Sequence, residues 1–352
     1  MSDKPLFSLA TKAPVLKSIM IGMVSIAVAS HVNASEKMPK SHISDGVYQV
    51  ERTAANNFSR QASELETSLV DYCSNVGNFS QLEQQWQQTM TTWMGLQGQE
   101  RGPQMALEQN WNVQFWPDKK NTTGRKMLAL VKQNKVDWQA SDIAKQSVTV
   151  QGLGAIEWLL YDQASDFKRS NSTCQLGVAI GQNLATNANK IAQAWQHNPW
   201  TQMSEKQWDS EYVAMLSNQL DYSIKKLSRP LAKIGKPRPY FAESWRSGTS
   251  MLNLKQNIEA MQALYLAGGF GLDAQLRKLG KAQLADRIKQ QFALTLDTWP
   301  TEQSLFELLK TKQGYQSVLA QRNKLEQLNY LIHEEVAIEL GVVIGFNATD
   351  GD

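Results

Sequence analysis

The stretch FSRQASELETSLVDY, residues 58–72, carries apolar side chains three or four positions apart. An α-helix turns once in about 3.6 residues, so this spacing gathers the apolar side chains on one face and leaves polar ones on the other. A helix of this kind packs its apolar face into a core. The stretch therefore predicts an amphipathic helix whose buried face is formed by Phe58, Ala62, Leu65, Leu69 and Tyr72.

The same spacing recurs in distant parts of the chain, at residues 254–265 and 325–336. Between such segments Gln, Ala, Leu, Lys and Glu are abundant, and the alternation of β-branched residues that marks a strand is nearly absent. We therefore expect an all-α fold. Each half of the mature chain is long enough for a bundle of about four helices. This predicts two helical-bundle-like domains, residues 35–200 and 201–352, with a cleft between them.

The first 34 residues have the pattern of a Sec-type signal peptide. Three lysines precede an apolar run at residues 19–29, and Val32 and Ala34 occupy the minus-three and minus-one positions of a cleavage site. The run is shorter than the roughly 20 apolar residues of a membrane span, and no later stretch is both long and uncharged enough for one. We therefore expect cleavage after Ala34, a periplasmic location, and no transmembrane segment in the mature chain.

Charge and cysteine content restrict the class of partner. The chain holds 36 Lys and Arg against 33 Asp and Glu, and removal of the signal takes away three lysines and one aspartate, which leaves a formal charge of +1. This balance gives no electrostatic basis for binding nucleic acid. The two cysteines are Cys73 and Cys174. A lone pair in an exported protein predicts one disulfide, and it is too sparse for a thiolate metal site.

An acidic residue interrupts the apolar stretch VQGLGAIEWLLY, residues 150–161. Glu157 must be buried or face a cleft there, and burying it without a partner would cost several kcal/mol, on the order of 2–7. Gly154 lies one helical turn before it on the same face, and the small residues Gly152 and Gly154 let another backbone or a ligand approach. The partner of Glu157 is either a ligand or an arginine, with the candidates Arg246, Arg101 and Arg125.

Three further segments stand out beside Gly152, Gly154 and Glu157. They are Gln114–Asp118 (QFWPD) with Gly124 and Arg125, Trp245-Arg246-Ser247, and Gly345–Asp352 (GFNATDGD). Together the four segments resemble the imelysin-like family, in which the first set corresponds to the signature Gly-x-His-x-x-Glu. The resemblance covers essentially the whole mature chain. It implies a periplasmic protein of two helical bundles, linked to bacterial iron uptake, with a binding cleft formed by Gly152, Gly154, Glu157, Trp245, Arg246, Ser247 and Asn347.

This chain departs from the family signature, because Gly154 stands where the motif has histidine. Some family members have been described as metallopeptidases, and a catalytic zinc normally takes three protein ligands. The run His333–Ala337 lacks the second histidine of a zinc-peptidase helix. We therefore favour a non-catalytic metal- or ligand-binding protein. The alternatives are a metallopeptidase that recruits His333 or His197, and a periplasmic scaffold in which Glu157 is purely structural.

A hard cation needs no histidine, since ferric iron and calcium accept an all-oxygen shell. Glu157, Asp350 and Asp352 would supply such a shell if the C-terminal segment folded back to the cleft. This predicts a metal site, with iron as the ion that the resemblance implies and an iron-uptake protein of the periplasm or outer membrane as partner. Four nearby aromatic residues form either an aromatic ligand pocket or core packing: Trp93, Trp111, Phe115 and Trp116.

Overall fold

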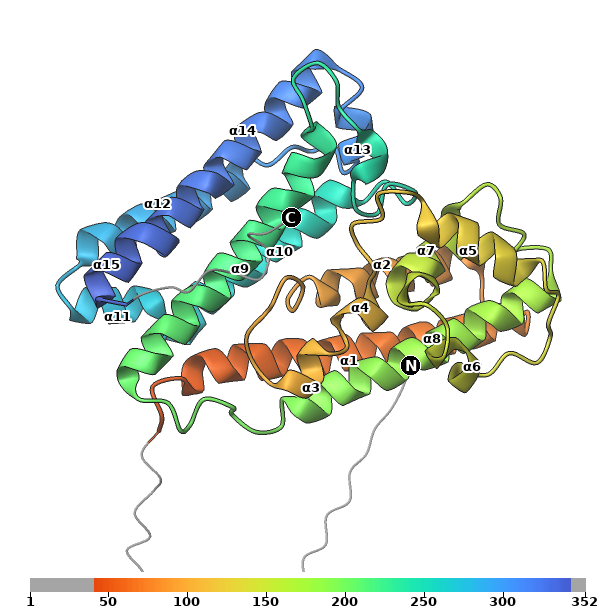
Figure 1. The fold of residues 1–352 in the computed structure, drawn as a ribbon, viewed down its shortest axis with the longest axis horizontal. Coiled ribbons are helices and arrows are strands. Elements are labelled where there is room, and N and C mark those ends of the chain that lie inside the picture. The colour runs from red at the N-terminus through yellow and green to blue at the C-terminus, as the bar shows by residue number, and fades with distance from the viewer. Residues whose placement is uncertain (1–40, 343–352) are drawn as a thin grey trace, which may run out of the picture. The chain divides into compact units, whose positions relative to one another are not determined.

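Helices form the regular structure of residues 41–342, which the computed structural model describes (Figure 1). These residues contain no β-strand; Lys233 and Lys236 make an isolated β-bridge. The prediction of an all-α fold is confirmed. The predicted signal peptide, residues 1–34, lies outside the described residues, as do Asn347, Asp350 and Asp352.

The first group of helices is built on α1 (Asp45–Cys73), α2 (Phe79–Trp93) and α8 (Asn171–Ala194). Helices α1 and α8 lie side by side along the lower edge of Figure 1. The predicted apolar face of α1 is buried, with Phe58, Ala62, Leu65 and Leu69 fully inaccessible. A disulfide joins Cys73, the last residue of α1, to Cys174 in the first turn of α8, with the two Cα atoms 5.7 Å apart. The predicted disulfide is therefore confirmed.

Short helices connect α2 to α8, because glycine and proline interrupt the chain in this region. They are α3 (Gln104–Leu107), α4 (Asn110–Val113), α5 (Thr122–Val131), α6 (Ala140–Ala144), the 3₁₀ turn η1 (Val148–Val150) and α7 (Gly152–Tyr161). Asn121 begins α5, where its side chain accepts a hydrogen bond from the Gly124 N–H at 3.2 Å. The last of these helices, α7, carries the motif with Glu157.

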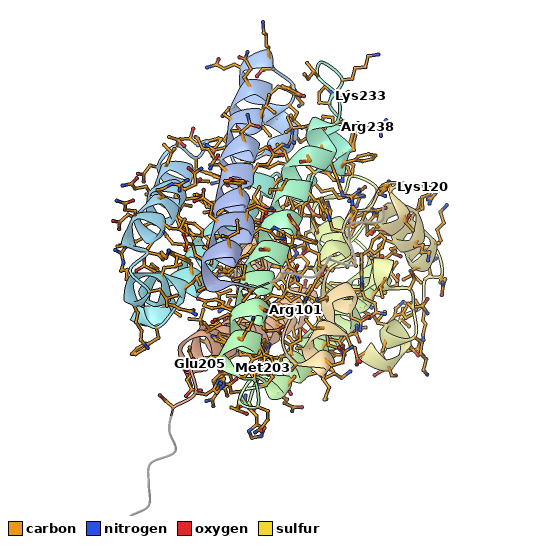
Figure 2. The ribbon with its side chains drawn as sticks, turned by 60° about the vertical axis from the view of Figure 1, so that its left-hand side comes forward. Arg101, Lys120, Met203, Glu205, Lys233 and Arg238 are labelled. Atoms are coloured by element: carbon orange, nitrogen blue, oxygen red, sulfur yellow. A yellow bond between two sulfur atoms is a disulfide. The ribbon has the colours of Figure 1, made fainter. Side chains whose placement is uncertain are left out.

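The second group is built on α9 (Glu205–Leu231), α10 (Ser250–Leu266), α12 (Ala282–Asp297) and α14 (Lys312–Asn329). Ser204 and Gln207 form a capping box that begins α9. Figure 2 shows Glu205 near one end of this helix and Lys233 in the loop beyond its other end. The remaining elements are η2 (Pro239–Phe241), η3 (Ala267–Gly269), α11 (Leu272–Lys278), α13 (Leu305–Leu308), the π-helical segment η4 (Tyr330–Val336) and α15 (Ala337–Leu340).

The two groups of helices touch where α10 contacts α1 and α2. Residue 200 falls in the connection between α8 and α9, so the predicted domain boundary separates these groups; their independence as domains stays a prediction. Among the helices of residues 41–342, none combines the length and the apolar character that a membrane span requires.

Candidate functional site

Helix α7 is buried on almost every side, and Gly152 makes its position possible. This glycine has a φ of +66°, and a Cβ built on it would lie 2.1 Å from the backbone oxygen of Val113 in α4. No other residue fits there without moving one of the two backbones. The predicted role of Gly152 in a close backbone approach is therefore explained by α4, and the helix that follows is fixed in place with Glu157 on it.

Glu157 is 5% exposed, and its two oxygens differ in their surroundings. Oε1 accepts two hydrogen bonds from Ser247, one from the backbone N–H and one from the hydroxyl, both at 2.9 Å. Oε2 accepts none from the described residues. Burial raises the pKa of Glu157, while the Ser247 N–H and the charge of Arg246 oppose that shift. Half of this carboxylate is thus satisfied by protein and half is left for another group.

Arginine does not neutralise Glu157. The Nε of Arg246 lies 2.6 Å from Oδ2 of Asp162, the residue that follows α7, and another of its nitrogens donates to Oδ1 of Asn121 at 2.7 Å. No ion pair within 4.0 Å joins Arg246 to Glu157 in residues 41–342. Arg101 pairs instead with Glu211, at 3.5 Å. The alternative in which an arginine bridges to Glu157, considered from the sequence, is therefore wrong for the described residues.

A small pocket of about 40 Å³ lies beside Glu157. One water molecule needs at least roughly 10–15 Å³ and occupies about 30 Å³ in the liquid, so the pocket has room for one or two. A Cβ built on Gly154 would have no neighbour within 4 Å, so the position of the missing motif histidine is open space. The lining includes residues from three of the four segments that resemble the imelysin-like family: Gln114, Phe115, Trp116, Asp118, Gly154, Glu157, Trp245 and Arg246.

Two loops from different helical groups contribute to the lining of this pocket. Asp118 comes from the loop before α5, and Tyr240 comes from the loop between α9 and α10. Figure 2 shows Lys120, from the first loop, toward the same end of the molecule as Lys233 and Arg238. Trp245 packs on the guanidinium of Arg246, whose central carbon lies 4.3 Å from the ring centroid. Arg246 therefore holds the second loop against α7 and α5 through its contacts with Asp162 and Asn121.

One of the lining residues, Glu243, belongs to a buried ion pair that sequence reasoning missed. Lys226 of α9 and Glu243 are each 2% exposed, and Nζ lies 2.5 Å from Oε2. Burial lowers the pKa of Lys226, and the charge of Glu243 opposes this. The carboxamides of Gln97, Gln114 and Asn257 complete the network. The sequence carries a lysine in α9 but gives no sign that it is buried.

The described residues do not form a metal centre by themselves. No group of three or more His, Cys, Asp or Glu side chains within residues 41–342 is arranged to hold an ion. The two oxygens of Asp118 accept hydrogen bonds from the N–H groups of Thr122 and Thr123, at 2.6 and 2.9 Å. Glu243 is paired with Lys226. Oε2 of Glu157 is thus the carboxylate oxygen of the pocket that the described protein leaves without a partner, and one such oxygen does not make a high-affinity site.

Histidine does not line the pocket. His333 lies on η4 and pairs with the neighbouring Glu334, with Nδ1 and Oε1 2.9 Å apart. His197 is exposed in the loop between α8 and α9. The recruitment of either histidine in space, which the metallopeptidase alternative needs, is not seen in this pocket.

The model of the imelysin family, peptidase M75, matches residues 52–332 of the chain. The chain belongs to the imelysin family. This match supports the resemblance noted in the sequence and includes the residues of the pocket, while the final segment lies beyond it.

Solved structures share the imelysin fold at low identity. An imelysin-like protein from Psychrobacter arcticum 273-4 is 18% identical, with a TM-score of 0.72 over 86% of this chain and 96% of that one. A putative iron-regulated protein A precursor from Parabacteroides distasonis ATCC 8503 is 12% identical, with a TM-score of 0.57 over 84% of this chain and 97% of that one. None of the curated proteins compared gives a match. At these identities the structures establish the fold of this imelysin-family chain alone.

Proposed function

We propose that this imelysin-family protein is an exported, non-catalytic binding protein of bacterial iron uptake, and that its ligand contacts Glu157. The observation that carries the proposal is the unequal carboxylate: Oε1 is held by Ser247, and Oε2 has no partner in the described protein. The Glu157 side chain is 5% exposed, and a carboxylate in so buried a place is costly unless donors or a cation meet it. The pocket beside it supplies the space for that group.

The proposed link to iron rests on similarity to a solved structure and on the sequence pattern of residues 1–34. The structural neighbour from Parabacteroides distasonis is a putative iron-regulated protein A precursor, and the signal pattern in residues 1–34 agrees with an exported protein. Because the described residues offer too few ligand atoms, iron at Glu157 needs further oxygen atoms. These come either from a chelating molecule bound with the ion or from Asp350 and Asp352, which were predicted as metal ligands and lie outside the described residues.

Calorimetric titration tests the role of Glu157. Mature protein is titrated with ferrous iron under argon and with ferric citrate, and Glu157→Gln is expected to weaken binding at least tenfold. Glu211→Gln is the matched control, because Glu211 is a half-buried carboxylate paired with Arg101 and does not line the pocket. No binding by the wild type, or equal binding by Glu157→Gln, would remove the iron role.

The double variant Asp350→Asn, Asp352→Asn tests where the remaining ligand atoms come from. If the C-terminal carboxylates complete the site, this variant loses ferrous binding as strongly as Glu157→Gln does. If a chelator completes it, ferric citrate still binds. Chelator-sensitive cleavage of unfolded casein by the wild type would overturn the non-catalytic part of the proposal and favour a metallopeptidase.

A further inference from the structure

A second pocket, larger than the one at Glu157, opens on the other side of Gln114 and Trp116. Its volume is about 170 Å³. At the roughly 30 Å³ that a water occupies in the liquid it holds about six waters, which is the volume of a monosaccharide. It lies between the loop that follows α2, helix α4 and helix α9, and its lining is Trp93, Gln97, Gly98, Gln99, Glu100, Asn110, Trp111, Gln114, Trp116 and Tyr222.

Aromatic rings and carboxamides dominate this lining. Trp93 and Trp116 are buried, whereas Trp111 is 53% exposed and leaves part of its ring uncovered. Trp116 meets Tyr222 edge to face, with centroids 5.4 Å apart. Gly98 has a φ of +80°, and a Cβ there would lie 2.7 Å from the Cβ of Tyr222, so this glycine lets the loop backbone close against the ring. The pocket therefore has apolar walls with amide groups set between them.

Several polar atoms of the lining have no partner among residues 41–342. The Tyr222 hydroxyl and Oδ1 of Asn110 make no hydrogen bond there, and Nε2 of Gln114 uses one of its two hydrogens, on Glu243 at 3.0 Å. These atoms include both donors and acceptors, so the complementary ligand carries groups that can act as either.

The pocket is close to electrically neutral. Glu100 is the charged residue of its lining, and it is exposed. The ion pair of Lys226 and Glu243 behind Gln97 cancels its own charge at 2.5 Å. The nearest cation to its walls, Arg229, lies outside the lining with its guanidinium 6.0 Å from the Trp116 ring centroid. The buried part of the lining therefore offers an ionic ligand no counter-charge in direct contact, while a neutral ligand is not penalised.

From these four features we infer that this second pocket binds a neutral, ring-shaped polyhydroxylated molecule of hexose size. Hydroxyl groups both donate and accept, which suits the unpaired oxygens and N–H groups of the carboxamides and of Tyr222. The C–H face of a sugar ring packs on the uncovered face of Trp111. The site is separate from the proposed contact at Glu157, although Gln114 and Trp116 form a common wall.

Saturation-transfer NMR and tryptophan fluorescence test this inference with the mature protein. The probes are D-glucose, D-galactose and myo-inositol, with glucuronate and glucosamine as charged counterparts of the same size. At least one neutral probe is expected to bind, at least tenfold more tightly than either charged one. Trp111→Ala is expected to weaken that binding at least tenfold. Tyr330→Ala is the matched control, because Tyr330 is an aromatic residue of equal exposure, 53%, outside the pocket.

Trp111 is half exposed, so its variant is expected to fold, and a circular-dichroism melt checks this. A panel in which no neutral probe binds would overturn the inference. So would equal binding of the charged probes, or unchanged binding by folded Trp111→Ala. Glu157→Gln is expected to leave sugar binding intact while it weakens iron binding, so failure of one proposal is distinguishable from failure of the other.

Discussion

Glu243 and Glu157 are both buried glutamates, with 2% and 5% of their surface exposed, but their neighbours differ. Two carboxamides donate to Oε1 of Glu243, and its Oε2 makes no hydrogen bond among the described residues but forms an ion pair with Nζ of Lys226 at 2.5 Å. Glu157 has Ser247 on one oxygen and a pocket beside it, with no cation within 4.0 Å in the described residues. Glu243 therefore has its charge paired within the protein, whereas Glu157 keeps one oxygen available to a group in the pocket. A binding site requires such an available group.

A third buried carboxylate extends the comparison. Glu51 on α1 is 2% exposed and is bonded to the amide of Gln99, and its Oε2 has no partner. Burial raises the pKa of Glu51 to about 8, against which the hydrogen bond from Gln99 acts weakly. At neutral pH this group is therefore largely protonated. Glu51 lowers the cost of burial by losing its charge, and Glu243 lowers it by pairing with Lys226. Glu157 lowers it through the hydrogen bonds of Ser247 to one oxygen, while the other oxygen has no partner in the described protein.

The largest effect on stability is expected from breaking the ion pair of Lys226 and Glu243. Lys226→Met removes the cation and leaves Glu243 buried without compensation, so the free energy of unfolding should fall by about 3–5 kcal/mol. Urea unfolding followed by circular dichroism measures this. The double variant Lys226→Met, Glu243→Gln should recover much of the loss. If the free energy of unfolding fell by less than about 1 kcal/mol in the single variant, Lys226 would not be stabilising the buried carboxylate of Glu243.

Glu51 should make stability depend on pH between about 4.5 and 8. A carboxyl whose pKa is raised by folding contributes stability that is fully present below its unfolded pKa and is lost as pH rises toward the folded value. We expect its contribution to fall by up to about 1.4 kcal/mol per pH unit across this window. Unfolding free energies measured at about one-unit steps from pH 5 to pH 8 should depend less on pH in Glu51→Gln than in the wild type. Parallel profiles for the two proteins would contradict the protonated state of Glu51.

Glu157→Gln should change stability less than either of these variants. The amide keeps an oxygen for the Ser247 N–H and hydroxyl and removes a buried charge, so the unfolding free energy should stay within about 1 kcal/mol of the wild type. Thermal melts of the metal-free protein measure it. A loss of about 3 kcal/mol or more would mean that Glu157 is a structural group, in the same class as Glu243.

Gly154→His should have the smallest effect on stability and a gain in metal binding. The position has open space around its Cβ, and histidine there would restore the family signature Gly-x-His-x-x-Glu beside Glu157. The stability change should be within about 1 kcal/mol, because glycine within a helix is itself unfavourable by about that amount. Calorimetry with ferrous iron or zinc should show at least tenfold tighter binding than the wild type. Gly154→Ala is the matched control, and equal affinity in the two variants would refute a role for the restored nitrogen.

Much of the fold was accessible from the sequence. The apolar spacing of residues 58–72 is local, and an amphipathic helix needs no knowledge of the partner that covers it. The same holds for the all-α class and for the cysteine pair, since a chain with two cysteines has a single possible intramolecular pairing. The predicted proximity of Gly154 and Glu157 also follows from helix geometry, and both line one pocket.

The sequence could not choose the partners of charged groups. Lys225 and Lys226 are neighbours in α9, yet one is half-buried and the other is 2% exposed against Glu243. Arg246 was a candidate partner for Glu157 and binds Asp162 instead. These pairings depend on where helices from distant segments cross. The type of a single residue does not reveal which distant residue it will meet.

The sequence by itself determined the helical class, the disulfide and the helix face on which Glu157 lies, because each depends on spacing along one segment or on a count. The tertiary structure alone decided that Ser247 occupies one oxygen of Glu157, that Asp162 takes the guanidinium of Arg246, and that Gly154 borders open space. Hydrogen bonds and ion pairs form over a few ångströms between residues far apart in the chain, so only the packing of the helices selects them.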